Sequence, residues 1–538
     1  MTGTCTALVG AVRNAVDGLA PEAARLAAAQ LVHCVGRLNG GVSDAQALEL
    51  LKALLRKRWF DIADPLADAF AAIPSASSEL RRRCAQVMLE RGRHGPALRI
   101  LLDLRGKPDV DAAEVLGHIA RIRKQEYVES IEQGAPDARL LERATRAYLD
   151  AYEEDPDART WHGINAVALL RCCEGESGLD ALRRRKDAST LARAILDRVS
   201  GMPQRQTWDL GTAAEAALAL GEYDQAAAWL RQYIGDAGAD AFELGATLRQ
   251  LEQIWRLGER SDPSARALLD LLRAALLEKT NATVPVTAAD IQRVRTTAPQ
   301  LEAVFGIDRF DSLENYRRGL ERCACVARIG RSTETGAGTG FVLPGRLLGL
   351  EPPEAFVLVT NAHVLSDRDA ERNRGSLHPV EAVVTFAALP GVSPEQAFEI
   401  GDILFSSDRE ALDVTVARLR PDIPAVAAYP VAQVLPARES KAQVRVIGHP
   451  SGRGLSFSVN ELLDHESPRV HYRTATEGGS SGSPVFNPEW KLIALHHAGG
   501  QSVPRLNGQD GSYQANEGIW IGAIREGIRR HLDTPRSG

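Results

Sequence analysis

The chain has 538 residues, of which 44% are hydrophobic and 25% charged, and its formal net charge is −6. This length is too great for one hydrophobic core, so we expect about two to four domains. The mild acidity argues against a nucleic-acid-binding protein, and no stretch approaches the ~18 uncharged apolar residues that a membrane span needs. The first 20 residues include Arg13 and Asp17 and lack the apolar core of a secretory signal.

All cysteines lie within the first 325 residues: Cys5, Cys34, Cys84, Cys172, Cys173, Cys323 and Cys325. Their odd number and irregular spacing are typical of a reducing compartment, so the sequence predicts a cytoplasmic protein without a disulfide framework. Cys323 and Cys325 resemble a metal or redox pair, but no second pair accompanies them. We interpret them as ordinary thiols at the edge of a strand.

Residues 5–275 are rich in Ala, Leu, Arg and Glu and have helical periodicity. Leucines at three- and four-residue steps, such as Leu48, Leu51 and Leu55, mark amphipathic helices. Short loops with Gly or Pro separate these segments, which predicts antiparallel neighbouring helices. The first part of the chain is therefore expected to be all-α.

Two passages of this region are alike. Each has a helical run, a glycine and a second helical run that opens on small residues, with the glycines at Gly92 and Gly221. Small residues allow close helix packing and glycine permits the turn. This arrangement resembles tetratricopeptide repeats.

A longer series of motifs lies between residues 152 and 255. It runs from Tyr152-Glu-Glu-Asp-Pro-Asp through Trp161-His-Gly-Ile-Asn to Trp208-Asp-Leu-Gly and Thr247-Leu-Arg-Gln-Leu-Glu-Gln-Ile-Trp255. Together with the repeats, residues 50–260 resemble the TRAF-binding domain of the apoptosis-signalling MAP kinase kinase kinases. The resemblance implies a protein-binding or regulatory platform. We interpret Trp161, His162, Trp208 and Trp255 as core residues.

The pattern changes twice further along the chain. Residues 280–287 break the helical periodicity and are expected to be a loop, and one or two short helices follow before residue 320. After Cys323, short β-type runs alternate with Gly, Pro and Asp clusters, and a strand over 518–524 is expected to lead into a helix over 525–531. Many short strands over about 210 residues predict a sandwich or barrels.

Three motifs in this second half provide the chemistry of nucleophilic catalysis. They are Thr360-Asn-Ala-His363-Val, Leu412-Asp413-Val-Thr-Val and Gly478-Gly-Ser-Ser481-Gly-Ser-Pro. A hydroxyl needs an adjacent imidazole to take its proton, and the imidazole needs a carboxylate to orient it. The glycine-rich turn also lets the N–H groups of Gly479 and Ser481 converge on a developing oxyanion.

These motifs, in this order, resemble the trypsin-like serine peptidases, with the closest likeness to the disulfide-free bacterial branch that includes the glutamyl endopeptidases. The resemblance covers about residues 322–538 and implies two β-barrels. It assigns Ser481 as nucleophile, His363 as general base and then acid, and Asp413 as the residue that orients His363. The amides of Gly479 and Ser481 would form the oxyanion hole.

The resemblance also indicates a substrate pocket. Thr476 and His496 stand where glutamyl endopeptidases bind an acidic P1 side chain, and Ala475 stands where a trypsin-type basic preference would need an aspartate. An acidic P1 residue and small or apolar P1 residues both remain open. The remaining histidines of this half, such as His449, His465, His471 and His497, lack metal-ligand spacing, so no metal and no cofactor is expected.

The sequence thus predicts a multidomain protein with three parts. They are an all-α repeat region over 1–275, a linker with short helices over 276–320 and an all-β double-barrel trypsin-like domain over 321–538. The expected function is peptide-bond hydrolysis on a protein substrate, with a protein partner bound by the repeats and with neither nucleic acid nor membrane. The alternative is a signalling scaffold whose protease-like domain binds peptide without turnover. By analogy of fold, the fusion suits bacterial stress or defence signalling.

Overall fold

The computed structural model describes residues 2–17, 21–38, 41–56, 59–174, 176, 178–180, 182, 186–279, 282–296, 301, 304–305, 310–424, 426, 428–440, 442–452, 454–473 and 480–534. The chain divides into two compact units. The first unit comprises residues 1–238 and 249–260, and the second comprises 239–248 and 261–538. The two units are described separately below.

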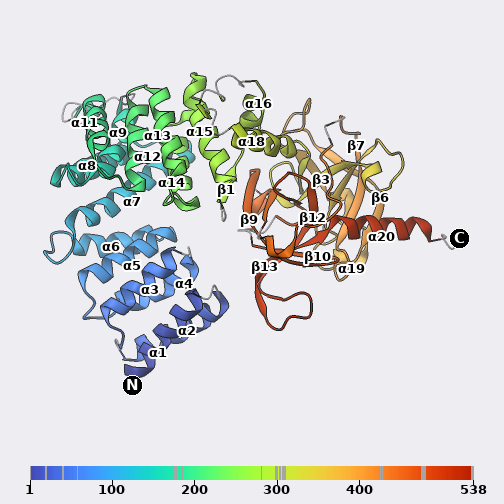
Figure 1. The fold of residues 1–538 in the computed structure, drawn as a ribbon, viewed down its shortest axis with the longest axis horizontal. Coiled ribbons are helices and arrows are strands. Elements are labelled where there is room, and N and C mark those ends of the chain that lie inside the picture. The colour runs from blue at the N-terminus through green and yellow to red at the C-terminus, as the bar shows by residue number, and fades with distance from the viewer. Residues whose placement is uncertain are drawn as a thin grey trace. The chain divides into compact units, whose positions relative to one another are not determined.

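The first unit is helical, as predicted, and its helices run from blue to green in Figure 1. Consecutive helices pack against each other as hairpins, for example α1 with α2, α5 with α6 and α12 with α13. Its helices are α1 (Thr2–Asp17), α2 (Pro21–Leu38), α3 (Asp44–Arg56), α4 (Phe60–Ala71), α5 (Ser78–Glu90), α6 (His94–Leu104), α7 (Ala112–Glu132), α8 (Ala138–Glu154), α9 (Thr160–Cys173), α11 (Ala188–Gly201), α12 (Thr207–Ala219) and α13 (Tyr223–Gly235). The boundary between the units passes through α14 (Ala241–Gln253).

The two passages predicted as repeats have the same turn. Gly92 between α5 and α6 has φ +69°, and Gly221 between α12 and α13 has φ +77°. In each turn the residue after the glycine donates its N–H to a carbonyl five residues back, from Arg93 to Met88 at 2.9 Å and from Glu222 to Ala217 at 3.0 Å. This six-to-one bond closes a helix C-terminus in the Schellman manner, which requires a left-handed residue that glycine supplies without strain.

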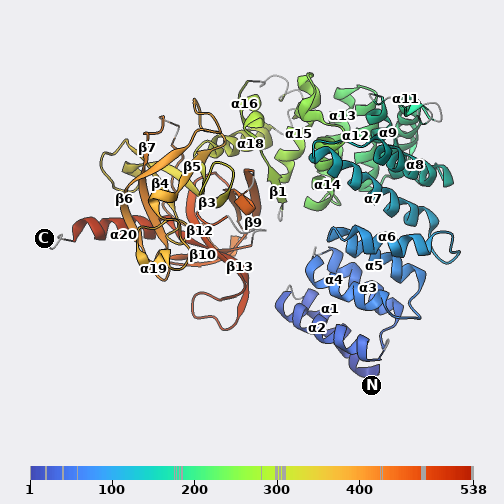
Figure 2. The same ribbon diagram turned by 180° about the vertical axis from the view of Figure 1, so that it is seen from behind.

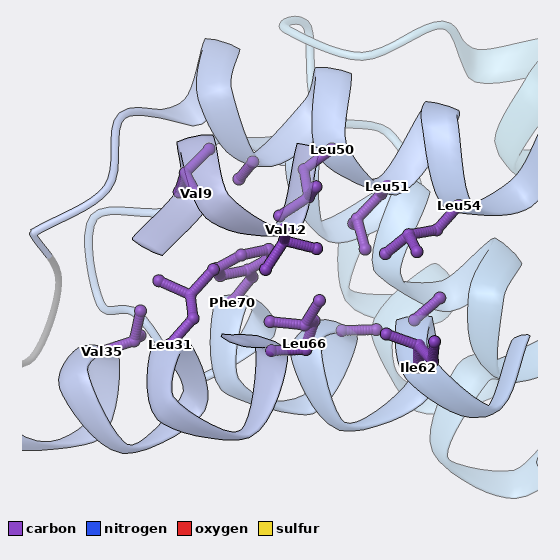
Figure 3. Close-up of a cluster of buried hydrophobic side chains, with 14 of the residues drawn as sticks. Val9, Val12, Leu31, Val35, Leu50, Leu51, Leu54, Ile62, Leu66 and Phe70 are labelled. Atoms are coloured by element: carbon purple, nitrogen blue, oxygen red, sulfur yellow. The ribbon is translucent and has the colours of Figure 1, made fainter. Parts of the chain in front are cut away.

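A core of hydrophobic side chains fills the space between the first helices (Figure 3). Leu31, Leu51, Leu54, Leu66 and Phe70 are all fully buried there. At the edge of this core the structure corrects one expectation, because Cys5 and Cys34 form a disulfide with a Cα–Cα distance of 5.9 Å. The spacing of the cysteines did not indicate the bond, which the packing of α1 on α2 makes possible.

Two of the four aromatic residues assigned to the core are not in it. His162 and Trp255 are buried, but the side chains of Trp161 and Trp208 are 41% and 53% exposed. In α9 the residues from His162 to Leu170 are all buried, and Trp161 is exposed in the first turn of the helix. The prediction was wrong for these two residues, because it relied on the average burial of tryptophan and did not know which face of each helix is packed.

The second unit contains the predicted double barrel, coloured yellow to red in Figures 1 and 2. The first barrel is closed, with the strand order β2-β3-β4-β7-β6-β5. Its strands are β2 (Val326–Gly330), β3 (Gly336–Pro344), β4 (Phe356–Thr360), β5 (Val383–Phe386), β6 (Phe398–Ser407) and β7 (Val414–Arg420). Residues of β2, β3, β4 and β7 are nearly all buried, which explains why these strands are apolar runs in the sequence.

The second barrel follows the order β9-β10-β13-β12-β11-β8 and closes through the pairing of β8 with β9. Its strands are β8 (Gln443–Gly448), β9 (Ser456–Glu466), β10 (Arg469–Tyr472), β11 (Pro484–Phe486), β12 (Leu492–Pro504) and β13 (Ser512–Trp520). The last strand ends earlier than predicted, because α20 (Ile521–Asp533) begins directly after Trp520. The apolar run over 518–524 is thus divided between a strand and the buried face of a helix.

The segment predicted as a linker contributes to the second unit. Residues 282–285, expected to be a loop, form the strand β1 (Ala282–Pro285), which pairs with Ser456–Val459 of β9. The helices α15 (Pro263–Leu276) and α16 (Ala288–Thr296) both contact α18 (Phe310–Cys323). The predicted division of the chain at residues 275 and 320 remains a prediction.

Helix α18 is anchored to the second barrel by Trp490. The indole N–H donates to Asn315 Oδ1 at 2.8 Å, and Gly319 lies so close to the ring that a Cβ there would stand 2.6 Å from it. Trp490 itself is fully buried, with the Arg445 guanidinium 4.7 Å from its ring centroid. A protein cut at residue 320 would expose this tryptophan and lose β1.

Cys323 is the last residue of α18 and Cys325 directly precedes β2, and both thiols are buried. Burial raises the pKa of the Cys325 thiol to about 12, which disfavours the reactive thiolate.

In the described part of the chain, no helix has both the length and the apolar character to cross a membrane.

Candidate active site

The turn that holds Ser481 is fixed by main-chain bonds on two sides. Ser481 O accepts a hydrogen bond from Thr339 N of β3 at 2.8 Å, and Gly482 N donates to His496 O of β12 at 2.9 Å. Gly482 has φ +89°, and a Cβ there would meet Thr339 O at 1.9 Å, so only glycine fits. The glycine after the serine, which the sequence motif contains, is therefore dictated by the close approach of the two barrels.

His363 and Asp413 are brought together from the ends of two paired strands of the first barrel. His363 follows β4, Asp413 precedes β7, and Thr360 of β4 pairs with Thr415 of β7. His363 Nδ1 lies 2.6 Å from Asp413 Oδ2, and the His363 main-chain N–H donates to Asp413 Oδ1 at 3.0 Å. The carboxylate thus holds both the ring and the backbone of the histidine.

Asp413 is fully buried and sits in a conformation that few residues adopt. Its φ is +43°, a left-handed value in which Asp and Asn are tolerated better than most residues. The side-chain amide of Asn361 donates to its carbonyl at 2.9 Å and fixes the turn. The sequence motif, an aspartate that opens a buried strand, does not reveal this constraint.

Burial by itself raises the pKa of Asp413, because it disfavours the charged form. The hydrogen bonds from His363 and His497 outweigh burial, so the pKa of Asp413 lies below its usual value. Asp413 is therefore a carboxylate at neutral pH. A buried carboxylate that accepts an imidazole N–H stabilises the imidazolium that general-base catalysis produces.

The same carboxylate has a second imidazole partner, which the sequence did not predict. His497 Nδ1 lies 2.6 Å from Asp413 Oδ2, the oxygen that also accepts from His363. The two imidazole rings are 6.3 Å apart between centroids. Because His497 directly follows His496 in a strand, alternation would place the two on opposite faces, and no signal in the sequence indicated that both reach the site.

Donor atoms of His363, Asp413 and His497 lie within 4.8 Å of one another and so have the composition of a metal-ligand set. Their N···O distances of 2.6 Å are those of hydrogen bonds. Two ligands of a tetrahedral zinc ion would stand farther apart, about 3.4 Å for bonds of ~2.1 Å. The distances therefore fit hydrogen bonds better than metal ligation.

His496, a predicted pocket residue, is buried beneath the turn. Its Nδ1 lies 2.7 Å from the Tyr472 hydroxyl, and its main-chain N–H donates to Ser483 O at 2.8 Å. Burial, reinforced by the neighbouring His497 and His363, lowers the pKa of His496 to about 3. The ring is therefore neutral and offers a hydrogen bond instead of a positive charge.

Gly479 of the predicted oxyanion hole, and Ala475 and Thr476 of the predicted pocket, lie outside the described residues. Among the contacts of the described residues, none joins the Ser481 hydroxyl to His363. Catalytic hydrogen bonds are often loose in the absence of substrate, so the roles of these residues remain predictions.

Comparison with known proteins supports both halves of this description. Residues 338–495 match the family described as the trypsin-like peptidase domain, and residues 45–170 match the Tetratricopeptide Repeats-Sensor family. The chain thus contains a trypsin-like peptidase domain, with a sensor region of tetratricopeptide type before it. The first match spans His363 and Asp413 as well as Ser481.

Relatives are distant. An uncharacterised protein, y4fB, from Sinorhizobium fredii is 28% identical over 231 residues, which make up 38% of this chain and 32% of that protein. The match thus spans about a third of the relative's length. Among solved structures, the active form of the Rv3671c protease from M. tuberculosis is 18% identical, covering 41% of this chain and 86% of its own, with a TM-score of 0.28. A serine endoprotease from Yersinia pestis is 13% identical, covering 40% and 66%, with a TM-score of 0.29.

Proposed function

We propose that this protein is a serine endopeptidase that hydrolyses peptide bonds of a protein substrate through an acyl-enzyme on Ser481. In this mechanism His363 takes the hydroxyl proton and later returns it to the leaving amine, and Asp413 holds the imidazole. The amides of Gly479 and Ser481 stabilise the oxyanion. The two half-reactions break and form one acyl bond each, with water as the second acceptor, and they need no metal and no cofactor.

The observation that supports this proposal most strongly is the His363–Asp413 pair. The Asp413 carboxylate is fully buried, its residue has a left-handed backbone conformation, and it contacts both the ring and the backbone N–H of His363. Strained residues of this kind cluster at active sites. The trypsin-like peptidase match over 338–495 supports the same reaction class.

The direct test is hydrolysis of a mixed peptide library by the full chain, with Ser481→Ala as the matched control. We expect cleavage by the wild type and a loss of about 10⁶-fold in kcat in the variant. Mass spectrometry of the quenched reaction should show an acyl adduct on the peptide that contains Ser481. Equal cleavage by wild type and variant would assign the activity to a contaminant and contradict the proposal.

For the substrate, the proposal keeps the two P1 classes that the sequence left open. Because His496 is neutral, a P1 carboxylate would meet a hydrogen bond from its Nε2 and no cation. Tyr472 supports that state, since a hydroxyl that donates to Nδ1 leaves the ring proton on Nε2. Side-by-side hydrolysis of Glu or Asp and Ala or Val reporter peptides decides between the classes, and equal rates would contradict an acidic pocket.

The helical unit is proposed to recruit or regulate, as its resemblance to the TRAF-binding domain and its sensor-family match suggest. The alternative is a scaffold in which the peptidase domain holds peptide without turnover. An active full chain that cleaves a bound partner faster than casein would support recruitment, whereas peptide binding without acylation would support the scaffold. A cytoplasmic location remains part of the proposal, although the Cys5–Cys34 disulfide argues against a strongly reducing environment.

A further inference from the structure

We propose that His497 is a positioning residue of the catalytic apparatus, which gives the Asp413 carboxylate a second imidazole partner beside His363 and is itself held by Glu517. This inference rests on the proposed peptidase function, because Asp413 matters for catalysis only if His363 is the base. It adds a second imidazole to the three residues that the sequence motifs identify.

The hydrogen bonds of Asp413 show what His497 contributes. Oδ1 accepts the main-chain N–H of His363 at 3.0 Å, and Oδ2 accepts from the two imidazoles at 2.6 Å each. The side chain is fully buried, so no solvent replaces a lost donor. Without His497, Oδ2 would keep one donor, and rotation of the carboxylate would be opposed by the contacts of His363 alone.

A β-bulge places His497 at the carboxylate. In the pairing of β12 with β13, His496 lies opposite Gly518 and Ala498 lies opposite Glu517, so His497 is the extra residue between them. A bulge bends the strand and changes the direction of its side chains, and bulges are frequent beside active sites. Here it allows two consecutive histidines to reach the site, the buried His496 on Tyr472 and the partly buried His497 on Asp413.

The far side of His497 is also held. Its Nε2 lies 3.4 Å from Glu517 Oε1, while Glu517 Oε2 lies 2.8 Å from His471 Nε2. His471 Nδ1 in turn lies 2.8 Å from the Tyr513 hydroxyl. The series His363–Asp413–His497–Glu517–His471–Tyr513 therefore alternates imidazole with carboxylate and ends on a hydroxyl.

The charge state of Glu517 supports this role. Burial favours its neutral form, but the hydrogen bond from His471 and the charge of the nearby Arg469 guanidinium outweigh burial, so the pKa of Glu517 is lowered. A carboxylate at each ring nitrogen orients the His497 ring, as second-sphere partners do for other functional imidazoles. Arg469 Nε, 3.3 Å from Glu517 Oε1, completes the surroundings of that carboxylate.

The test compares three variants of the full-length protein, two at His497 and one at its partner Glu517. His497→Ala removes both contacts, and we expect kcat to fall about 10- to 100-fold at unchanged KM, the effect of one hydrogen bond to a charged group. His497→Asn keeps an N–H donor near the position of Nδ1 and should restore most of kcat. Glu517→Gln should cost about three- to tenfold in wild type and nothing further in His497→Ala, because Glu517 acts through His497.

His465→Asn is the matched control. Its ring is partly buried in the same barrel and bonds Pro436 O at 3.0 Å, with no contact to the site, so kcat should stay as in wild type. If His465→Asn loses as much kcat as His497→Ala, the loss in His497→Ala reflects a general weakening of the barrel, and the proposal is overturned.

A second readout does not depend on activity. Proton NMR of the ¹⁵N-histidine-labelled Ser481→Ala chain should show two far-downfield imidazole N–H signals for the two short bonds to Asp413, and His497→Asn in that background should remove one. If Ser481→Ala and wild type hydrolyse peptides equally, the proposed function fails. If wild type is active but His497→Ala retains full kcat, or His497→Asn leaves both signals in place, only the positioning role is wrong.

Discussion

Each of the two units encloses a network of polar and charged side chains, and the two networks are built differently. In the helical unit, the Lys124 ammonium donates to Asn165 Oδ1 at 2.6 Å and to Gln250 Oε1 at 2.7 Å. The Gln250 amide and the Trp255 indole both donate to Glu215. In the barrel unit, carboxylates alternate with imidazoles and the series ends on His363, whose side chain is 22% exposed.

The difference concerns where each network ends. The helical network joins α7, α9, α12 and α14, and every bond just named is made to another member, as expected of a network that specifies packing. The barrel network ends at a ring that solvent and substrate can reach. We therefore expect changes in the first network to alter stability alone, and changes in the second to alter catalysis more than stability.

Among changes within the two networks, the largest expected effect comes from Asp413→Asn. Asparagine tolerates the left-handed φ of +43° and keeps the shape of the side chain, so the fold should survive. The amide cannot stabilise the imidazolium and orients the wrong tautomer of His363, so kcat should fall about 10⁴-fold. Steady-state kinetics and thermal unfolding measure the two effects separately. If Asp413→Asn unfolds the protein but leaves kcat per folded molecule unchanged, the barrel network serves stability like the helical one, and the contrast between the two networks is wrong.

The helical network should respond in the opposite way to Lys124→Met. Burial lowers the pKa of Lys124 to about 8, although Glu215 favours the charged form. Removing the cation leaves the Glu215 carboxylate without its counter-charge, so we expect a loss of about 3 kcal/mol in the free energy of unfolding. Hydrolysis of a short peptide should not change. Denaturant unfolding provides the measurement, and Lys124→Met/Glu215→Gln should recover most of the loss.

An acid-dependent effect of similar size is expected at His162. Burial, then the charge of Arg159, lowers its pKa to about 4, so the folded state holds the neutral ring while the unfolded chain binds a proton below about 6.5. Its contribution is therefore complete above pH 6.5 and is lost as the pH falls towards 4, about 3 kcal/mol in all. His162 Nδ1 is buried without a hydrogen bond, so His162→Leu should cost little at pH 7.5. Between pH 6.5 and 4, the unfolding free energy of the His162→Leu variant should fall less steeply than that of the wild type. Equal slopes for the two proteins would refute the prediction.

The smallest expected effect is the loss of stability when the glycines of the two repeat turns are replaced by alanine. Gly92→Ala and Gly221→Ala place a Cβ at positive φ, and each should destabilise the helical unit by about 1 kcal/mol. Gly95 lies in the first turn of α6, where an added Cβ would have no other atom within 4 Å, so Gly95→Ala should be neutral or slightly stabilising. Chemical denaturation compares the three, and equal values would mean that the Schellman turns have no special constraint.

The sequence predicted the order and type of elements where local patterns are strong. Buried strands such as β4 and β7 are apolar runs, and the turns at Gly92 and Gly221 follow small-residue patterns. Strands β6 and β9 have weaker sequence patterns, because acidic residues interrupt them, for example Glu399, Asp464 and Glu466. Strand β1 was missed because its partner, β9, lies more than 170 positions away in the sequence.

The candidate site was predictable to the extent that its motifs are local. His363, Asp413 and Ser481 each lie in a short motif beside a strand. His497 was not assigned because its contact with Asp413 depends on a bulge in β12, and the disulfide from Cys5 to Cys34 depends on helix packing. Both arise from tertiary structure, which a pattern of residue types does not encode.

The central claim is that Ser481 is an activated nucleophile, and labelling of the full chain with a fluorophosphonate probe tests it most directly. An unactivated serine does not react, so the wild type should be labelled on Ser481, the Asp413→Asn variant far more slowly and the Ser481→Ala variant not at all. A folded wild-type chain that takes up no probe, or a Ser481→Ala variant labelled as fast as the wild type, would contradict the account.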